Sequence, residues 1–410
     1  MEREQFKAIL ENYVAPMYTG AKVQDGGSPP ASRRQRRLAF LLNGSEMVVR
    51  PSKGATYQYI LRRSQYFEQQ DADFVENFLK RLVALKTIFT TQFFNDILNL
   101  VIRRTVSERL NPIAPDLTSE ILKQFETWAE QTYEGRRIAA AVGVDTTVNG
   151  GSGVPLLEVY GESYGVVLAN GFDSFLTVAK NGQIIGYEGL AQVPSGEKTF
   201  APLRFLRLAE WTENGKTGIG LNRNGEILLF KNKELAFAKR RGSWHHFTHA
   251  AVIQRASLNA SFTKELCAGV YQTCLDVSFA RTGGCIALVK RSTQNALLAD
   301  KIVNDRDRIG EGSLKSRCLK TFTGKPFHQL DRRLRQDIVA MDGATILDYM
   351  GKLMAAGAIV SVPSGSDGGG RLAATKRLAQ YGLAVKISGD GGIRGFADHA
   401  TGIKELFSVA

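Results

Sequence analysis

Residues 341–392 read MDGATILDYMGKLMAAGAIVSVPSGSDGGGRLAATKRLAQYGLAVKISGDGG, and this stretch decides the fold of the C-terminal part of the chain. Short apolar runs predict strands around 345–347, 358–361 and 384–387. Between them lie a glycine-rich turn and a basic helix start. Strands and helices that alternate in this way are typical of a mixed sheet flanked by helices, so we expect an α/β fold here.

The alternation begins well upstream of this stretch. Apolar residues at helical spacing predict a helix across 246–280 that is broken once near Asn259, and an apolar run predicts a strand over 285–290. We therefore expect an α/β domain over residues 236–410. A basic stretch near 232–243 is expected to join it to the preceding part of the chain.

Two further regions precede this domain. Residues 1–135 are predicted to be mainly helical, because apolar residues recur there at three- and four-residue spacing. Residues 136–235 are predicted to form a β-rich module, since short β-branched and aromatic runs alternate there with turn signals. The Asn-Gly pairs at 181–182 and 224–225 predict hairpins, and we expect the module to be a sandwich or a partly open barrel.

The composition excludes several classes of protein. The chain has 410 residues, 43% of them hydrophobic, and a net charge of +13, which favours polyanionic partners such as nucleotides or nucleic acid. Four cysteines without a CxxC pair, and a start, MEREQFKAIL, without an apolar run, indicate reduced thiols and no signal peptide, so we expect a cytoplasmic protein. The most apolar helix candidate, 82–102, contains Lys86, Asn95 and Asp96, so no membrane span is expected.

Candidate ligand-binding residues occur at two places in the quoted stretch. Asp342 offers a carboxylate in a tight turn, and carboxylates bind divalent cations. Gly368, Gly369 and Gly370 expose backbone N–H groups ahead of a helix that begins with Arg371, and such helix starts favour phosphate oxygens. The combination indicates a nucleotide with its metal ion.

Two other motifs are interpreted without a ligand. Residues 365–371, GSDGGGR, have nearly the spacing of a P-loop, but arginine and leucine replace its lysine and its hydroxyl residue. The run NDRDRIGEG, 304–312, holds Asp305, Asp307 and Glu311, but interleaved arginines offset their charge. We interpret this run as a solvated turn rather than a calcium site.

The first motif resembles the Asp-Gly-Ala turn of diadenylate cyclases, enzymes that condense two ATP molecules into cyclic di-AMP. It consists of Asp342, Gly343 and Ala344, although Met341 stands where that family usually has histidine. The glycine-rich run is similar to the family's Gly-Thr-Arg-His-Arg motif through its glycine and Arg371. Leucine and alanine occupy the next two positions, so the second motif matches only in part.

The resemblance extends to two further segments. Residues 270–292 look like the helix and strand that the family places ahead of the Asp-Gly-Ala turn. Ser388, Gly389 and Asp390 stand where the family has Ser-Glu-Glu. The likeness covers only the domain expected at 236–410 and leaves the rest of the chain unmatched.

The resemblance implies a function and a cofactor. Asp342 would hold Mg²⁺ or Mn²⁺ with Asp390 as a second carboxylate, and the glycines and Arg371 would bind the triphosphate of ATP. Lys376, in the next turn of the helix, would be a further cation. Two protomers would meet face to face, so that each ribose 3′-hydroxyl attacks the other ATP. The β-rich module would then act as a sensor.

Two alternatives stay open. Leu372 and Ala373, in place of histidine and arginine, remove up to two charges, each worth about 1.5–3 kcal/mol in a charge-assisted hydrogen bond. Lys376 compensates only if it faces the ligand, and it points about 140° away from Arg371 on a helix. A nucleotide sensor without catalysis therefore fits the residues nearly as well. The second alternative is a nucleic-acid-binding protein, based on the net positive charge.

Overall fold

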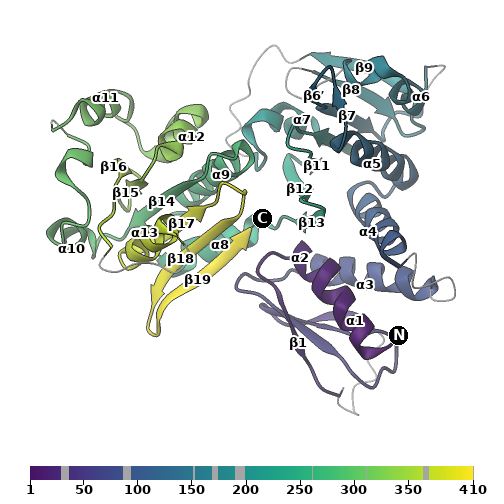
Figure 1. Ribbon diagram of the computed structural model, residues 1–410, viewed down its shortest axis with the longest axis horizontal. Coiled ribbons are helices and arrows are strands. Elements are labelled where there is room, and N and C mark those ends of the chain that lie inside the picture. Colours follow the sequence, from purple (N-terminus) through teal and green to yellow (C-terminus); the bar gives the residue numbers. More distant parts are fainter. Residues whose placement is uncertain are drawn as a thin grey trace. The chain divides into compact units, whose positions relative to one another are not determined.

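The computed structural model describes residues 1–28, 37–85, 94–150, 153–168, 174–189, 199–260, 262–310, 312–362 and 369–409. The chain forms two compact units, Met1–Phe247 and Thr248–Ala410 (Figure 1). The joint expected at 232–243 lies inside the first unit, because β12 (Glu234–Arg240) and β13 (Ser243–His246) belong to its larger sheet. No helix in the described ranges is long and apolar enough to cross a membrane.

The N-terminal part of the first unit combines helices with a small antiparallel sheet. Its elements are α1 (Arg3–Ile9), the π-helix η1 (Leu10–Val14), α2 (Ala15–Met17), β1 (Lys22–Asp25), β2 (Ala39–Asn43), β3 (Glu46–Val49), β4 (Tyr59–Arg62) and α3 (Gln69–Ala84). The strands pair in the order β1-β4-β3-β2, and α3 packs against β2. The expectation of a mainly helical region over 1–135 is therefore wrong for 22–62. These strands are short, and burial of β3 along its whole length stabilises them rather than any long apolar run.

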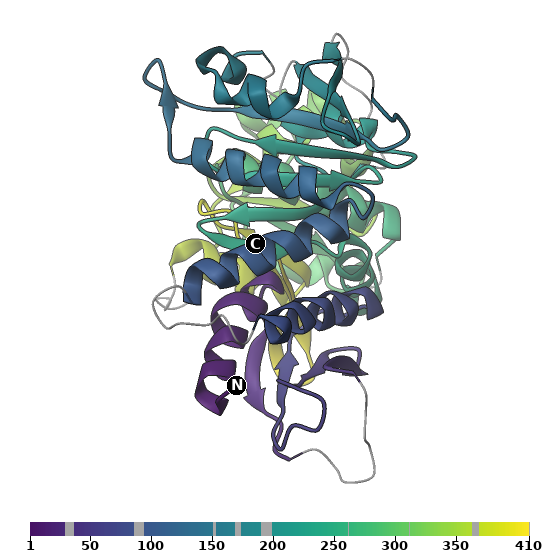
Figure 2. The same ribbon diagram turned by 90° about the vertical axis from the view of Figure 1, so that its right-hand side faces the viewer.

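The rest of the first unit contains a seven-stranded sheet and a separate two-stranded hairpin. Besides β12 and β13, its elements are α4 (Phe94–Leu110), α5 (Pro115–Ala129), β5 (Thr132–Tyr133), β6 (Arg136–Arg137), β7 (Ala140–Asp145), α6 (Leu156–Gly161), η3 (Ser163–Val166), β8 (Ser174–Ala179), β9 (Ile184–Gly189), η4 (Leu203–Phe205), α7 (Leu206–Trp211), β10 (Lys216–Leu221) and β11 (Ile227–Lys231). The strand order is β13-β12-β11-β10-β7-β8-β9. β7 and β8 are parallel, and the other neighbours are antiparallel. Figure 2 shows the blue helices α4 and α5 lying across the sheet, where they contact β11.

The two hairpins expected at Asn-Gly pairs are confirmed. They join β8 to β9 and β10 to β11. Their glycines have positive φ, 86° at Gly182 and 73° at Gly225, which glycine adopts without a steric penalty. The strands nevertheless form a single sheet with β13 and β9 at its edges in the described residues, so the expectation of a sandwich or barrel is wrong.

A buried ionic cluster connects three segments of the first unit. Asp71, in the first turn of α3, accepts a hydrogen bond from Arg63 Nη2 at 3.1 Å, and its other oxygen lies 2.8 Å from His246 Nδ1 of β13. Burial alone would raise the pKa of Asp71, but His246, Arg63 and the Glu68 amide together lower it. Because breaking a buried pair of this kind costs about 3–5 kcal/mol, the cluster holds both sheets and α3 together.

The second unit is a six-stranded mixed sheet with helices on both faces. Its elements are α8 (His249–Ala260), α9 (Lys264–Ala280), β14 (Gly284–Val289), α10 (Gln294–Ala299), η5 (Asp305–Asp307), α11 (Leu314–Phe322), η6 (Phe327–Gln329), α12 (Arg332–Ala340), β15 (Ala344–Leu347), β16 (Leu353–Ala358), α13 (Gly370–Ala379), β17 (Gly382–Ile387), β18 (Ile393–His399) and β19 (Gly402–Val409). The strand order is β16-β15-β14-β17-β18-β19. β14 and β15 are parallel, and the other neighbours are antiparallel. The expected mixed sheet flanked by helices is thus confirmed.

The central strand β14 separates two layers of this unit. Cys285 and Ala287 lie on the face that packs with Leu378 of α13. Gly284 approaches the opposite helices, because a Cβ there would lie 2.7 Å from the carbonyl oxygen of Val339 in α12. The break expected near Asn259 is confirmed, because α8 ends at Ala260 and α9 begins at Lys264. Of the strand expected at 358–361, only Ala358 belongs to a strand, as the last residue of β16.

His245 of β13 makes the stability of the first unit depend on pH. Burial, and to a smaller extent Arg240, lower the pKa of His245 to about 4. Because an unfolded histidine has a pKa of about 6.5, stability is fully present above about pH 6.5 and is lost as pH falls toward the folded value. We predict that the melting temperature falls over this window and falls less in His245→Gln. Circular dichroism measures the melting temperature of the unmodified chain, of His245→Gln and of the exposed control His399→Gln at each pH. Parallel plots of melting temperature against pH for all three proteins would refute the prediction.

Candidate functional site

The topology of the second unit brings the candidate residues to one edge of its sheet. β15 runs parallel to β14 and β17 runs antiparallel to it, so the starts of β14 and β15 lie beside the end of β17. We call this the Asp342 edge and define it by residues 281–284, 342–344, 369–371 and 388–391. Neighbouring strands are about 4.8 Å apart, so the turns before β15 and after β17 are separated by about 10 Å.

Asp342 stands in the tight turn between α12 and β15. Its side chain is exposed and has no hydrogen-bond or ion-pair partner among the described residues. Gly343 has a φ of 105°, and a Cβ there would lie 2.6 Å from the carbonyl carbon of Gly357 and 2.7 Å from Ala358 N. Ala344 is buried and begins β15. The turn therefore packs directly on the backbone of β16 and presents the Asp342 carboxylate outward.

Residues of η5 and α11 support β16 behind this turn. Lys315 Nζ donates to Asp307 Oδ1 at 2.7 Å and to the carbonyl oxygen of Gly357 at 3.2 Å. The Ile359 N–H donates to Asp307 Oδ2 at 3.3 Å. Asp307 is 6% exposed, so the interpretation of 304–312 as a solvated turn is wrong at this residue. Sequence analysis did not predict the pair of Lys315 and Asp307, because β16, which this pair supports, lies much later in the chain.

The glycine-rich run leads into α13 at the same edge. Gly369, with a φ of 86°, is the N-cap of α13, and a Cβ on Gly369 or Gly370 would meet no other described residue within 4 Å. Within the described part of the chain, no residue therefore covers the Cα positions of these two glycines. A Cβ on Gly283 would lie 2.4 Å from Arg371 Nη1 and 3.2 Å from Gly389 N. The Arg371 guanidinium thus lies over the start of β14, beside the turn that follows β17.

Thr375 places the first turn of α13 against Cys285 of β14. Thr375, one turn after Arg371 in α13, donates to the Arg371 carbonyl oxygen at 2.8 Å, and its hydroxyl is 3.3 Å from Cys285 Sγ. Burial raises the pKa of Cys285 to about 11, and the Thr375 hydroxyl and the Arg371 charge oppose that rise. The first turn of α13 is therefore attached to β14 at the Asp342 edge.

The C-terminal end of α9 holds the turn after β17. Ser278 Oγ donates to the carbonyl oxygen of Gly391 at 2.5 Å, and Arg281 donates to the carbonyl oxygen of Asp390. Within the turn, the Gly391 N–H donates to the carbonyl oxygen of Ser388 at 2.8 Å. Ser278 and Arg281 lie in the segment 270–292 that carries part of the resemblance, but sequence analysis gave them no role, because a helix pattern does not indicate the later turn that they hold. Their contacts fix the backbone of the turn and leave the Asp390 side chain exposed.

Three further residues near the start of α13 do not add charge to the edge. Leu372 packs against the core of the unit, and Ala373 is buried. Lys376 is exposed, about 140° around the helix from Arg371, and no described contact brings it to the edge. Gly368, like Glu311, lies outside the described residues.

A divalent cation at the Asp342 edge would have one clear carboxylate ligand. The described residues contain no group of three or more His, Cys, Asp or Glu side chains that could hold a metal ion. Asp342 and Asp390 stand at the ends of β15 and β17, with β14 between them. Mg²⁺ often binds through one or two carboxylates together with phosphate oxygens of a substrate, and the exposed Asp342 fits that mode of binding.

Comparison with known proteins identifies no family for the chain. No protein-family model matches it, and no curated protein does. A function for the Asp342 edge therefore has to be inferred from its own residues and their arrangement.

Gly343 is the most constrained residue of the edge. We predict that Gly343→Ala lowers the free energy of unfolding by about 1–3 kcal/mol, because both the positive φ and the contact with β16 oppose a Cβ. Gly370→Ala is the matched control, since its Cβ at a helix start would meet no other described residue within 4 Å. Chemical denaturation of both variants measures the difference. Equal stability of the two would contradict the close packing of the turn.

Proposed function

We propose that the second unit binds ATP or a related nucleoside triphosphate and joins two of them into a cyclic dinucleotide, cyclic di-AMP in the case of ATP. The observation that carries the proposal is the convergence of the Asp342 turn, the glycine-rich start of α13 and the turn after β17 at one edge of the sheet. The resemblance of these three segments to diadenylate cyclases supports the same reaction.

Each segment has a distinct role in this proposal. The backbone N–H groups at the glycine-rich start of α13 would donate hydrogen bonds to phosphate oxygens, and the helix dipole favours negative charge there. Arg371 adds a guanidinium beside them. Asp342 would hold Mg²⁺ or Mn²⁺, which neutralises charge that develops on the phosphate. Ser388 and Asp390 offer a hydroxyl and a carboxylate for contacts with the nucleoside.

The proposed reaction is a symmetric phosphoryl transfer. Each ribose 3′-oxygen attacks the α-phosphorus of the other nucleotide and forms an O–P bond. The bond from that phosphorus to pyrophosphate breaks at the same time, and the hydroxyl proton leaves to water. Two triphosphates thus give one cyclic dinucleotide and two pyrophosphates.

Such a product requires two copies of the Asp342 edge. One Asp342 turn with one glycine-rich run forms a site for one triphosphate, so a two-fold pairing of identical surfaces is needed. Ile359, which is 62% exposed and follows β16 beside the Asp342 turn, offers an apolar side chain for this contact. The proposal therefore includes a homo-oligomer, with the first unit as its sensor.

Nucleotide sensing without catalysis is the second candidate function. Leu372 packs into the core and Ala373 is buried, so Arg371 is the cation that the described part of α13 places at the edge. Each missing charge-assisted hydrogen bond weakens triphosphate binding by about 1.5–3 kcal/mol. A sensor needs only moderate affinity for the nucleotide and no pairing of two edges. The single cation that the described part of α13 places at the edge therefore favours a sensor.

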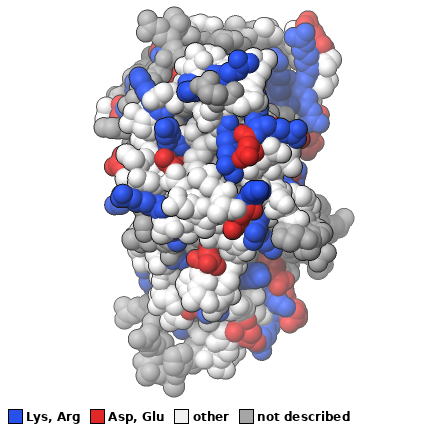
Figure 3. All heavy atoms as spheres, turned by 90° about the vertical axis from the view of Figure 1, so that its left-hand side faces the viewer, with Lys and Arg blue, Asp and Glu red and all other residues white. Residues whose placement is uncertain are grey.

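Nucleic-acid binding is a third candidate with less support. It rests on the net charge of +13. On the face shown in Figure 3, Lys and Arg side chains are scattered among uncharged and acidic residues rather than gathered into one continuous band. Nucleic-acid-binding proteins usually concentrate their basic residues in a patch or stripe.

Asp342→Asn tests the role of the carboxylate. We predict that it lowers the affinity for ATP at least about tenfold when Mn²⁺ is present and leaves the melting temperature nearly unchanged, because an exposed carboxylate contributes little to the core. Asp398→Asn, an exposed substitution in β18, is the matched control. Isothermal titration calorimetry with and without Mn²⁺ measures the effect. An affinity equal to that of the control would remove Asp342 from the site.

Product analysis separates catalysis from sensing. We predict that incubation with ATP and Mn²⁺ yields a cyclic dinucleotide and pyrophosphate. The specific activity should rise with protein concentration over the range in which two copies of the Asp342 edge associate. Mass spectrometry of the products and a dilution series measure both quantities. Binding of ATP without any product would favour the sensor. Activity that stays constant on dilution to demonstrated monomers would exclude the face-to-face reaction.

A further inference from the structure

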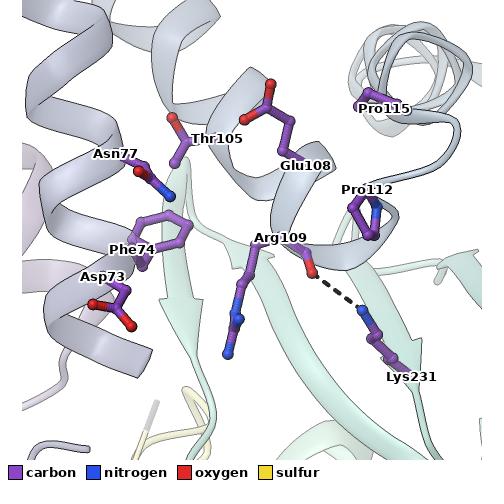
Figure 4. Close-up of a pocket in the computed structure, with 9 residues that line it drawn as sticks. All are labelled: Asp73, Phe74, Asn77, Thr105, Glu108, Arg109, Pro112, Pro115 and Lys231. Carbon is purple, nitrogen blue, oxygen red and sulfur yellow. Dashed lines mark hydrogen bonds between the residues drawn. The ribbon is translucent and has the colours of Figure 1, made fainter. Parts of the chain in front are cut away.

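The first unit contains a cleft between α3, α4 and β11 (Figure 4). Its volume is about 380 Å³, which lies within the range of roughly 300–1,000 Å³ that is usual for small-molecule sites. Phe74 and Asn77 of α3, Thr105 and Arg109 of α4, and Lys231 of β11 line it. The cleft takes no part in the function proposed above for the second unit.

The two cations of the cleft have only neutral acceptors. Arg109 donates to the side-chain carbonyl oxygen of Gln70, and Lys231 Nζ donates to the backbone carbonyl oxygen of Arg109 at 3.3 Å. Figure 4 shows this second contact and the guanidinium extending into the space between the helices and the sheet. Neither cation forms an ion pair within the described part of the chain. Within the described residues, the cleft therefore contains two positive charges without an ion-pair partner.

The carboxylates that line the same cleft are paired with other residues. Asp73 forms an ion pair with Arg37 and accepts a hydrogen bond from Gln69 Nε2 at 2.9 Å. Glu108 forms an ion pair with Arg81. Because both carboxylates have cationic partners of their own, they leave Arg109 and Lys231 uncompensated.

The partial burial of Lys231 favours the binding of an anion in this cleft. Burial, and then the charge of Arg109, lower the pKa of Lys231. Two neighbouring cations of which one is partly buried are both stabilised by an anion that contacts them together. Pro112 and Pro115 add an apolar wall, and the exposed Asn77 amide adds hydrogen-bond donors and an acceptor.

We propose that this cleft binds a small organic anion whose phosphate or carboxylate group lies between Arg109 and Lys231 and whose apolar part packs against Pro112 and Pro115. Such a ligand neutralises both cations, and the volume of the cleft accommodates it. The site belongs to the first unit alone, so it stands whether or not the second unit binds a nucleotide.

Calorimetric titration of the full chain with three probes tests the proposal. Phenyl phosphate and benzoate separate phosphate from carboxylate recognition, and inorganic phosphate shows what the apolar ring adds. We expect phenyl phosphate or benzoate to bind more tightly than inorganic phosphate. Arg109→Gln and Lys231→Gln should each weaken that binding about tenfold or more, because each removes a charge-assisted hydrogen bond.

Two controls locate the binding. Arg136→Gln, on the exposed hairpin of β5 and β6, should bind the probes as the unmodified chain does. Arg371→Gln, which weakens phosphate binding at the Asp342 edge in the proposed function, should retain the binding that Arg109→Gln and Lys231→Gln weaken. Melting temperatures confirm that the variants fold. Because Arg109 is exposed, Arg109→Gln should disturb the fold less than Lys231→Gln. The proposal is overturned if neither organic probe binds, if both cleft variants bind normally, or if Arg371→Gln abolishes binding. Equal affinity for phenyl phosphate and inorganic phosphate overturns the role of the prolines.

Discussion

The pairing of β14 with a parallel strand on one side and an antiparallel strand on the other is the constraint on which the second unit depends. This arrangement brings the turn before β15 and the turn after β17 to the same edge, although the two turns are far apart in the chain. α13 covers one face of β14, and the contact of Thr375 with Cys285 places its first turn at that edge. Without the mixed pairing, Asp342, Arg371 and Asp390 would not be neighbours.

Burial explains which strands could be predicted. β14, β15 and β17 are almost completely buried, so each reads as an apolar run. β18 and β19 were not predicted, since their exposed ends are polar and glycine interrupts the pattern. Gly395 weakens the strand signal of β18, yet the fold needs it, because a Cβ there would lie 2.3 Å from the Phe407 ring. Packing between neighbouring strands, which one segment of sequence does not reveal, decides such positions.

The same distinction applies to the site. The places of Asp342 in a turn and of Gly369 and Arg371 at a helix start could be predicted, because both features have local signatures. The supporting residues could not. Ser278 and Arg281 hold a turn that comes about a hundred residues later, and Lys315 compensates a buried Asp307. Long-range pairs of this kind leave no pattern in the sequence. The alternating charges around Asp307 indicated an exposed turn, whereas in the fold Asp307 is buried and paired with Lys315.

The arrangement of support and open backbone bears on whether the edge can catalyse a reaction. The turn after β17 is held by two side chains of α9, and Gly343 is packed against β16, so two of the three segments are preorganised. The third, the start of α13, presents Gly369 and Gly370, where an added Cβ would meet no other described residue within 4 Å. Catalysis of a symmetric transfer needs both nucleotides positioned within a fraction of an ångström. In the proposed reaction, a triphosphate would therefore complete the third segment itself, with Arg371 as its cation, and the second copy of the edge would supply the remaining constraint.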